Sequence, residues 1–134
     1  MTEHRHDDLE DIRRLLANYN LHLDVDDVDA WVELFTDDAE YHVYGRVFAG
    51  HDGIRKIPTG APKGLHLGGQ PFIELVGDDR ASVRSNLLFV EAGTDVLRSV
   101  VYDDDLVRTE AGWRFAVRRC RFIRTHGLDD RPER

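Results

Sequence analysis

The chain has 134 residues and a mass of 15.4 kDa, which is the length of one domain. Its composition, 41% hydrophobic and 33% charged, is typical of a soluble globular protein, and no apolar run approaches the ~20 residues of a membrane span. The net charge of −8 argues against duplex nucleic acid or an anionic membrane as a partner. Because the lone Cys120 cannot form an internal disulfide and no signal peptide is expected, we predict a cytoplasmic protein.

The charge is unevenly distributed along the chain. Residues 1–40 hold 13 acidic residues against 3 arginines, whereas residues 41–134 hold 15 basic residues against 13 acidic ones. This division is typical either of separate modules or of two oppositely charged layers of one domain. Since helical patterning gives way to strand patterning near residue 40, we predict one domain over 1–134, with frayed tails at about 1–7 and 127–134.

Two helices are predicted in the acidic part. Apolar residues recur at three- and four-residue spacing over residues 8–23, the pattern of a helix with one buried face. A shorter helix is predicted from Val28 to Phe35, capped by Asp26 or Asp27. The polar run 36–38 is predicted to end it as a turn.

Strands are predicted for most of the remainder. The expected elements are a strand or hairpin at 41–47, one or two helical turns at 50–57 stopped by Pro58, a flexible loop at 59–64, and strands at about 65–76, 80–92, 95–108 and 113–124. In the last strand the apolar positions change from odd, up to Val117, to even, from Cys120, which predicts a β-bulge near 117–119. Helices followed by long antiparallel strands predict an α+β fold.

Several short motifs occur in an order that resembles a known family. They are Tyr19 with Asp24, Asp29-Ala30-Trp31, Leu34-Phe35-Thr36-Asp37-Asp38-Ala39, Gly50-His51-Asp52-Gly53-Ile54, Leu65-His66-Leu67, Tyr102-x-Asp104 with Leu106-Val107-Arg108-Thr109, Gly112-Trp113-Arg114-Phe115 and Arg118-Arg119. Over residues 8–124 the chain resembles the SnoaL-like branch of the NTF2-like superfamily, which includes scytalone dehydratase, bile-acid 7α-dehydratase, ketosteroid isomerase-like proteins and polyketide cyclases. The resemblance implies a cystatin-like cone, in which N-terminal helices pack on a strongly curved mixed, mainly antiparallel sheet that encloses an apolar pocket.

The resemblance also implies three site residues. In dehydratase-like members a Tyr and an Asp near the end of the first helix meet a His on a sheet strand, and these positions match Tyr19, Asp24 and His66. A histidine titrates near neutral pH and suits a general base. Asp24 would orient the imidazole, and Tyr19 would donate a hydrogen bond to a carbonyl or enolate oxygen. Of the early carboxylates, Asp24 is therefore the one expected to be buried.

The residues alone leave these roles open. His66 is also compatible with a half-buried strand histidine, Asp24 with a helix-end carboxylate, and Tyr19 with core packing. Five residues at about 100° each separate Tyr19 from Asp24 by roughly 140° around a helix. Both can therefore reach one cavity only if the sheet wraps around the end of the helix.

Other polar residues offer alternatives. His22 and His42 are alternative bases, and His51 is expected near a helix cap. The predicted pocket wall comprises Trp31, Phe35, Tyr41, Leu87, Phe89 and Phe122, with Glu91 as an extra acid or base and Ser99 as a donor to a substrate oxygen. No metal or other cofactor is expected, because no convincing element carries histidines at metal-ligand spacing. Asp104 and the arginines of the last two strands, Arg118 among them, are expected to form cross-strand pairs or to face the acidic helices.

These observations lead to one function and two alternatives. The first is a small cofactor-independent lyase (dehydratase) or isomerase that abstracts a proton next to a carbonyl of a hydrophobic polyketide-, steroid- or terpenoid-like substrate. The second is a non-catalytic member that binds a hydrophobic ligand or acts in assembly. The third, support of an oxygenase, requires a large apolar outer sheet face, which the many Arg and Asp residues disfavour. An open sheet also favours self-association as a homodimer or homotrimer.

Overall fold

The computed structural model describes residues 2–132. Its elements are α1 (Thr2–Asp24), α2 (Val28–Val32), β1 (Phe35–Val43), β2 (Arg46–Ala49), α3 (Gly50–Ile54), α4 (Lys56–Gly60), β3 (Gly64–Gly68), β4 (Phe72–Val76), β5 (Arg80–Glu91), β6 (Leu97–Thr109), β7 (Gly112–Arg124) and β8 (Gly127–Asp129). The strands form a mixed sheet in the order β2-β1-β7-β6-β5-β3, with β4 paired to β5 and β8 to β7. The α+β prediction is confirmed.

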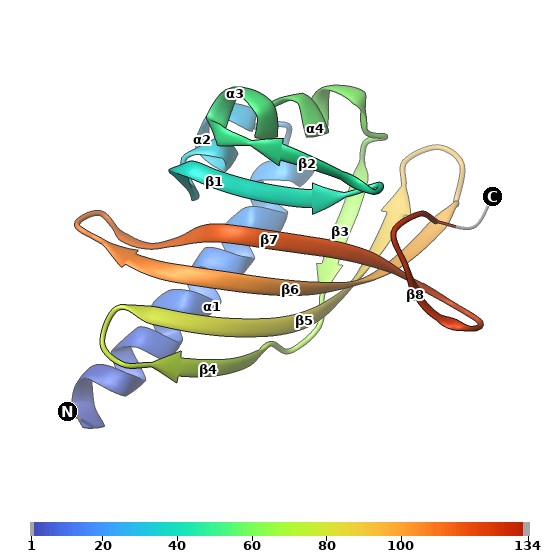
Figure 1. Cartoon of the computed structure of the whole chain (residues 1–134). Coiled ribbons are helices and arrows are strands. Elements are labelled where there is room, and N and C mark those ends of the chain that lie inside the picture. Colours follow the sequence, from blue (N-terminus) through green and yellow to red (C-terminus); the bar gives the residue numbers. More distant parts are fainter. Residues whose placement is uncertain (1, 133–134) are drawn as a thin grey trace.

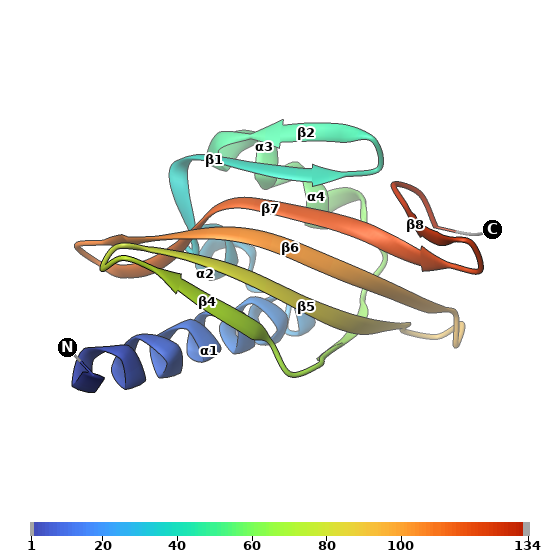
Figure 2. The same ribbon diagram turned by 60° about the horizontal axis from the view of Figure 1, so that its bottom comes forward.

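The helices lie on the concave face of a curved, open sheet. Figure 1 shows α1 crossing behind β5, β6 and β7, and Figure 2 shows α1 and α2 on one side of the strands. Strand alternation decides which side chains enter the core: in β6 the buried residues are Val100, Tyr102, Asp104 and Leu106, at every second position. Neighbouring strands β5, β6 and β7 pair antiparallel, whereas β1 runs parallel to β7.

The first helix is longer than predicted, because its beginning is anchored. The helix starts at Thr2, so most of the segment expected to fray is helical. Asp8 accepts a hydrogen bond from Trp113 Nε1 at 3.2 Å and pairs with Arg108 at 2.6 Å. At the other end, residues 127–129 pair with β7 instead of fraying. The expected tails also include residues 1, 133 and 134, which lie outside the described residues.

The segment after α2 differs from the prediction. The second helix ends at Val32, and residues 36–38, predicted as a turn, belong to β1. Phe35 pairs with Phe115 of β7, and the backbone N–H of Phe115 donates to the Leu34 carbonyl at 2.9 Å. The register then shifts between Phe35 and Glu40, which leaves the polar residues between them outside the ladder. Tertiary pairing therefore overrides a local preference for a turn.

The strand predicted at 65–76 is two strands, and the helical segment before it also differs. Gly69 and Pro71 fall between β3 and β4; Pro71 lacks an N–H, and the Gly69 N–H donates to the Asn86 carbonyl at 2.9 Å. The two strands pair with different halves of β5. Pro58 lies inside α4 rather than ending the helix, because the first helical turn needs no N–H at that position.

The bulge predicted near 117–119 is confirmed one residue earlier. Asp105 pairs with Val117 and Leu106 with Phe115, so Ala116 is the extra residue in β7. The side chains of Phe115 and, beyond the bulge, of Arg118 are both buried on the concave face. The change from odd to even apolar positions in the sequence is therefore explained by this bulge.

The charge asymmetry corresponds to the two layers. Ion pairs join acidic residues of the N-terminal segment to basic residues elsewhere: Asp8 to Arg108, Asp26 to Lys63 and Asp29 to Arg55. The expectation that Asp24 is the buried early carboxylate is only partly met. The Asp8 side chain is 10% exposed, whereas the Asp24 side chain retains 17% of its accessible surface, because it lies at the open end of α1.

Candidate active site

A cavity of about 220 Å³ opens between the concave sheet face, the C-terminal half of α1 and the segment from α4 to β3. Its walls are mostly aromatic and aliphatic, and it contains both Tyr19 and His66. Five of the predicted wall residues line it: Trp31, Tyr41, Leu87, Phe89 and Phe122. Pockets of this kind, apolar with a few convergent polar groups, are where small molecules bind.

Three predicted pocket residues do not line the cavity. Phe35 lies behind its wall, with its ring 5.1 Å from those of Trp31 and Phe115. Ser99 alternates with the buried Val100 and points to the outer face, opposite Leu88. Glu91 ends β5, and its carboxylate accepts a hydrogen bond from the Thr94 hydroxyl in the following turn.

A second cavity, of about 270 Å³, lies on the other side of Leu87 and Tyr102. Its polar walls come from Asn20, Ser85 and Asn86, together with two arginines. Of the residues within 2–132 that line it, none carries a carboxylate or an imidazole. Acid–base chemistry therefore points to the first cavity.

Asp24 and His66 are joined across the edge of the sheet. Asp24 is the last residue of α1, and His66 is the central residue of β3, with its side chain on the cavity side. Asp24 Oδ1 accepts hydrogen bonds from His66 Nδ1 at 2.7 Å and from the His66 backbone N–H at 2.9 Å. The two side chains are 17% and 16% exposed. Asp24 itself does not line the cavity; it reaches the site through His66.

This arrangement fixes the protonation state of the imidazole. A carboxylate only accepts hydrogen bonds, so Nδ1 carries the proton and Nε2 carries the lone pair. Burial lowers the pKa of His66 below its usual 6.5, and the bond to Asp24 partly opposes that shift. At neutral pH the imidazole is therefore neutral, as a general base must be.

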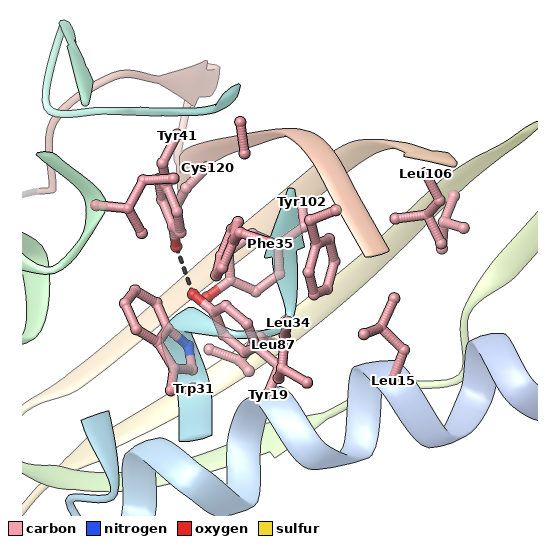
Figure 3. Close-up of a cluster of buried hydrophobic side chains, with 14 of the residues drawn as sticks. Leu15, Tyr19, Trp31, Leu34, Phe35, Tyr41, Leu87, Tyr102, Leu106 and Cys120 are labelled. Atoms are coloured by element: carbon pink, nitrogen blue, oxygen red, sulfur yellow. Dashed lines mark hydrogen bonds between the residues drawn. The ribbon is translucent and has the colours of Figure 1, made fainter. Parts of the chain in front are cut away.

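Three tyrosines converge on the inner end of the cavity. The hydroxyls of Tyr19 and Tyr41 are 2.6 Å apart, as the dashed line in Figure 3 shows, and Tyr102 lies beside them. Burial raises the pKa of all three phenols above 10.0, so their hydroxyls remain protonated donors. The Tyr19 side chain points into the core, whereas the Asp24 side chain points toward β3. The two side chains therefore leave α1 in different directions, as their angular separation around the helix requires.

A buried ion pair between Arg118 and Asp104 lies beside the tyrosines, with the guanidinium against the rings of Tyr19 and Tyr102. The Arg118 guanidinium lies 4.1 Å from the Tyr19 ring centroid and 3.5 Å from that of Tyr102. Arg118 Nε is 3.0 Å from Asp104 Oδ1, and the two side chains are 2% and 0% exposed. Cross-strand pairing was one of the two arrangements expected for Asp104 and the arginines of the last strands, and Asp104 pairs in this way with Arg118, but the complete burial of the pair has no signal in the sequence. Arg118 does not line the cavity; it holds a positive charge against the faces of the phenols.

The other histidines and Cys120 have different surroundings. His42 bonds to Glu40 at 2.9 Å at the protein surface, and His51 Nε2 donates to the Phe35 carbonyl at 2.9 Å. His22 is not among the residues that line the cavity. Burial raises the pKa of the Cys120 thiol to about 12, so the thiol stays protonated.

Among the charged and phenolic residues that line the cavity, sequence reasoning missed four: Tyr44, Lys63, Arg98 and Tyr102. Two of them had a signal, because Arg98 and Tyr102 share the even parity of Val100 in β6. Within residues 2–132, no group of three or more His, Cys, Asp or Glu side chains is arranged to hold a metal ion. Over the same residues, none of the helices is long and apolar enough to cross a bilayer.

Comparison with known proteins identifies similar chains. Residues 4–119 match the family model of the SnoaL-like domain, whereas no curated protein sequence matches the chain. A solved protein of unknown function from Mycobacterium tuberculosis is 27% identical, with a TM-score of 0.83 over 92% of this chain and 76% of that one. A protein from Novosphingobium aromaticivorans, provisionally named a scytalone dehydratase, is 24% identical, with a TM-score of 0.85 over 100% and 94%.

A third structure extends the range of chemistry found on this fold. It is a type 3 hexachlorocyclohexane dehydrochlorinase from Novosphingobium barchaimii, 18% identical, with a TM-score of 0.81 over 99% and 94% of the two chains. Further structural neighbours are described as having a cystatin-like fold. The predicted cystatin-like fold is therefore confirmed.

Proposed function

The chain belongs to the SnoaL-like family, and on that basis we propose that it is a lyase or isomerase that removes a proton next to a carbonyl, using its own side chains. The substrate is a hydrophobic, oxygenated ring compound, since the cavity is aromatic with a few polar groups at its ends. Two structural neighbours named for eliminations, a dehydratase and a dehydrochlorinase, support this class of reaction.

The observation that carries the proposal is the Asp24–His66 hydrogen bond. With Nδ1 donating to Asp24 at 2.7 Å, Nε2 is the basic atom, and it belongs to a residue of the cavity wall. Asp24 keeps this tautomer in place and stabilises the imidazolium that forms when Nε2 accepts a proton. A positioned base of this kind contributes about 10²–10⁴-fold to the rate.

The tyrosines supply the second part of the chemistry. As the C–H bond breaks, its electron pair moves into the carbonyl and an oxyanion develops. In the 2.6 Å bond between Tyr41 and Tyr19 one hydroxyl donates and the other accepts, so one O–H of the pair is available to donate to that oxygen. The buried charge of Arg118 behind the Tyr19 and Tyr102 rings makes these phenols better donors.

The two reactions differ in where the proton goes next. In an elimination, the enolate expels a β-hydroxyl, which takes the proton from His66 Nε2 and leaves as water, giving an enone. In an isomerisation, the imidazolium returns the proton to another carbon of the conjugated system. Both steps regenerate the neutral imidazole and need no external oxidant or reductant.

The alternatives fit the structure less well. Binding without catalysis requires no acid–base pair, whereas Asp24 and His66 lie 2.7 Å apart at an open cavity. Support of an oxygenase requires a large apolar outer face. The outer face at β6 and β7 instead carries pairs such as Asp105–Arg119 and Asp103–Arg121.

The experiment is a proton-abstraction assay that does not depend on the natural substrate. Cyclic ketones such as 2-tetralone are incubated with the protein in D₂O, and deuterium uptake next to the carbonyl is followed by NMR. With 3-hydroxy-1-tetralone, loss of water is followed by the appearance of 1-naphthol. We expect both reactions to be catalysed by the wild type and to fall by at least ~100-fold in His66→Gln and Asp24→Asn.

His42→Gln is the matched control, because His42 lies on the other side of the sheet and bonds only to Glu40 among the described residues. Circular dichroism establishes that each variant folds. Undiminished exchange in folded His66→Gln would contradict the proposal.

A further inference from the structure

Arg98 is a cation on the cavity side of the sheet. In β6 the side chains at even positions face the core, and Arg98 shares this parity with Val100 and Tyr102. It lines the cavity together with Tyr44 and Phe122, whose rings stack 5.7 Å apart. Burial raises the pKa of Tyr44, and the charge of Arg98 opposes that shift, which agrees with their proximity.

Within residues 2–132, Arg98 has no acidic partner for its charge. The hydrogen bond of its guanidinium is made to the backbone: Nη1 donates to the carbonyl of its neighbour Leu97 at 3.3 Å. Lys63, the other cation at the cavity, is already bound to Asp26 at 2.6 Å. The described lining residues include neither Asp nor Glu, although acidic residues outnumber basic ones by 26 to 18 in the chain.

The sheet register relates Arg98 to the proposed base. His66 of β3 pairs with Phe89 of β5, and Phe89 pairs with Arg98 of β6, so the three residues form one row across the concave face. Two strand spacings put the Cα atoms of His66 and Arg98 about 10 Å apart. The Phe89 ring lies between them, 4.9 Å from the imidazole.

From this row we infer that the protein selects substrates bearing an anionic group, a carboxylate in the simplest case, which Arg98 binds while the ring stacks over Phe89 toward His66. The inference rests on the proposed function for the identity of the reacting carbon. A guanidinium binds a carboxylate through two parallel hydrogen bonds and therefore also fixes the orientation of the ligand. The carboxylate of the substrate and the C–H bond that is broken then lie at opposite ends of a substrate with one ring or two fused rings.

The test compares two ligands of equal shape and different charge. The probes are 6-oxo-5,6,7,8-tetrahydronaphthalene-2-carboxylate and the corresponding 2-carboxamide, titrated calorimetrically into the full chain. We expect the wild type to bind the carboxylate at least ~10-fold more tightly, and Arg98→Gln to bind both about equally. Arg98→Lys keeps part of the preference, and high salt reduces it in the wild type.

Two further variants make the result specific. Arg121→Gln removes a cation from the outer face, where Arg121 pairs with Asp103, and keeps the preference. His66→Gln also keeps the preference while losing deuterium exchange, so failure of the proposed chemistry is distinguishable from failure of this inference. Equal affinity for the two probes in the wild type, no binding of the carboxylate at millimolar concentration, or equal weakening of both probes by Arg98→Gln would overturn it.

Discussion

A single oxygen of Asp24 accepts two hydrogen bonds from His66, one from the ring and one from the backbone. The backbone bond fixes the position of β3 relative to the end of α1, and the ring bond fixes the orientation of the imidazole. One carboxylate therefore controls both where the base lies and which of its nitrogens is free. Because the contact joins residues 24 and 66, it forms only when the helix and the sheet edge have both folded.

The first prediction concerns the titration of His66. Burial lowers its pKa, whereas the hydrogen bond and the negative charge of Asp24 raise it. We expect a pKa below 6.5 in the wild type and a still lower one in Asp24→Asn, because the carboxylate that favours the imidazolium is lost. The measurement is an NMR titration of the imidazole C–H resonances without ligand. An upward shift in Asp24→Asn would show that Asp24 does not stabilise the imidazolium.

The lowered pKa of His66 also predicts how the free energy of unfolding depends on pH. A histidine whose pKa is lowered by folding is neutral more often in the folded than in the unfolded chain. The unfolded chain therefore binds more protons below pH 6.5, and the free energy of unfolding decreases as the pH falls through that range.

The second prediction separates the tyrosine hydroxyls from the rings. Tyr41→Phe removes one donor and leaves the ring in place, so we expect kcat toward a reactive probe ketone to fall about 10²–10³-fold. Tyr44→Phe is the control, because Tyr44 lines the same cavity but lies away from the Tyr19 hydroxyl, stacked on Phe122. Steady-state kinetics on both variants is the measurement, and equal effects would argue against an oxyanion site at Tyr41.

The third prediction tests the buried ion pair. Arg118→Met leaves the Asp104 carboxylate without its cation in a fully buried position. We expect a loss of about 3–5 kcal/mol in the free energy of unfolding at pH 8, measured by urea denaturation. Arg119→Met, which breaks the exposed pair with Asp105, should cost less than about 1 kcal/mol.

The cost of Arg118→Met should also depend on pH. Burial raises the pKa of Asp104, and the charge of Arg118 opposes this shift in the wild type. Without Arg118 the folded chain keeps Asp104 protonated at pH values where the unfolded chain releases the proton. The free energy of unfolding of the Arg118→Met variant therefore decreases as the pH rises from 5 to 8. Adding Asp104→Asn to the same chain should remove this pH dependence.

The fourth prediction concerns Gly64, which begins β3 two residues before the base. A Cβ atom there would overlap the Val90 carbonyl oxygen and come within 2.9 Å of the Phe89 ring. We expect Gly64→Ala to cost about 1–3 kcal/mol in unfolding free energy and to displace His66. Gly60→Ala is the control, because no atom lies within 4 Å of the corresponding Cβ. Equal stability of the two variants would contradict the close approach.

Part of this structure could be predicted because the spacing of apolar residues in the sequence indicates which side chains are buried. The apolar spacing in residues 8–23 identified the first helix, and the change of parity after Val117 identified the bulge. The order of short motifs indicated the family, and with it the positions of Asp24 and His66. Their hydrogen bond spans 42 residues, so no local pattern encodes it.

Other features depend on pairing partners that a linear pattern does not contain. Residues 36–38 have the composition of a turn, yet they lie within β1, because Phe35 before them and Glu40 after them both pair with β7. Adjacent residues in a strand face opposite sides of the sheet, so only one of Arg98 and Ser99 can face the pocket. Ser99 was the residue expected there, but Arg98 lines the cavity. Choosing between them requires knowing which face of β6 is concave, which the buried Val100 reveals only in the folded chain.

The extra residue at Ala116 has a consequence for how this protein can change over time. Phe115 before the bulge and Arg118 beyond it face the same side of the sheet, although three positions separate them, because Ala116 is left out of the pairing with β6. Loss of Ala116 would give a regular ladder in which Phe115, Val117 and Arg118 keep their partners Leu106, Asp105 and Asp104, and therefore their sides of the sheet. Deletion of that one residue is therefore a change of length that β7 can absorb, whereas a deletion beyond the bulge would turn the later side chains of β7 to the opposite side of the sheet.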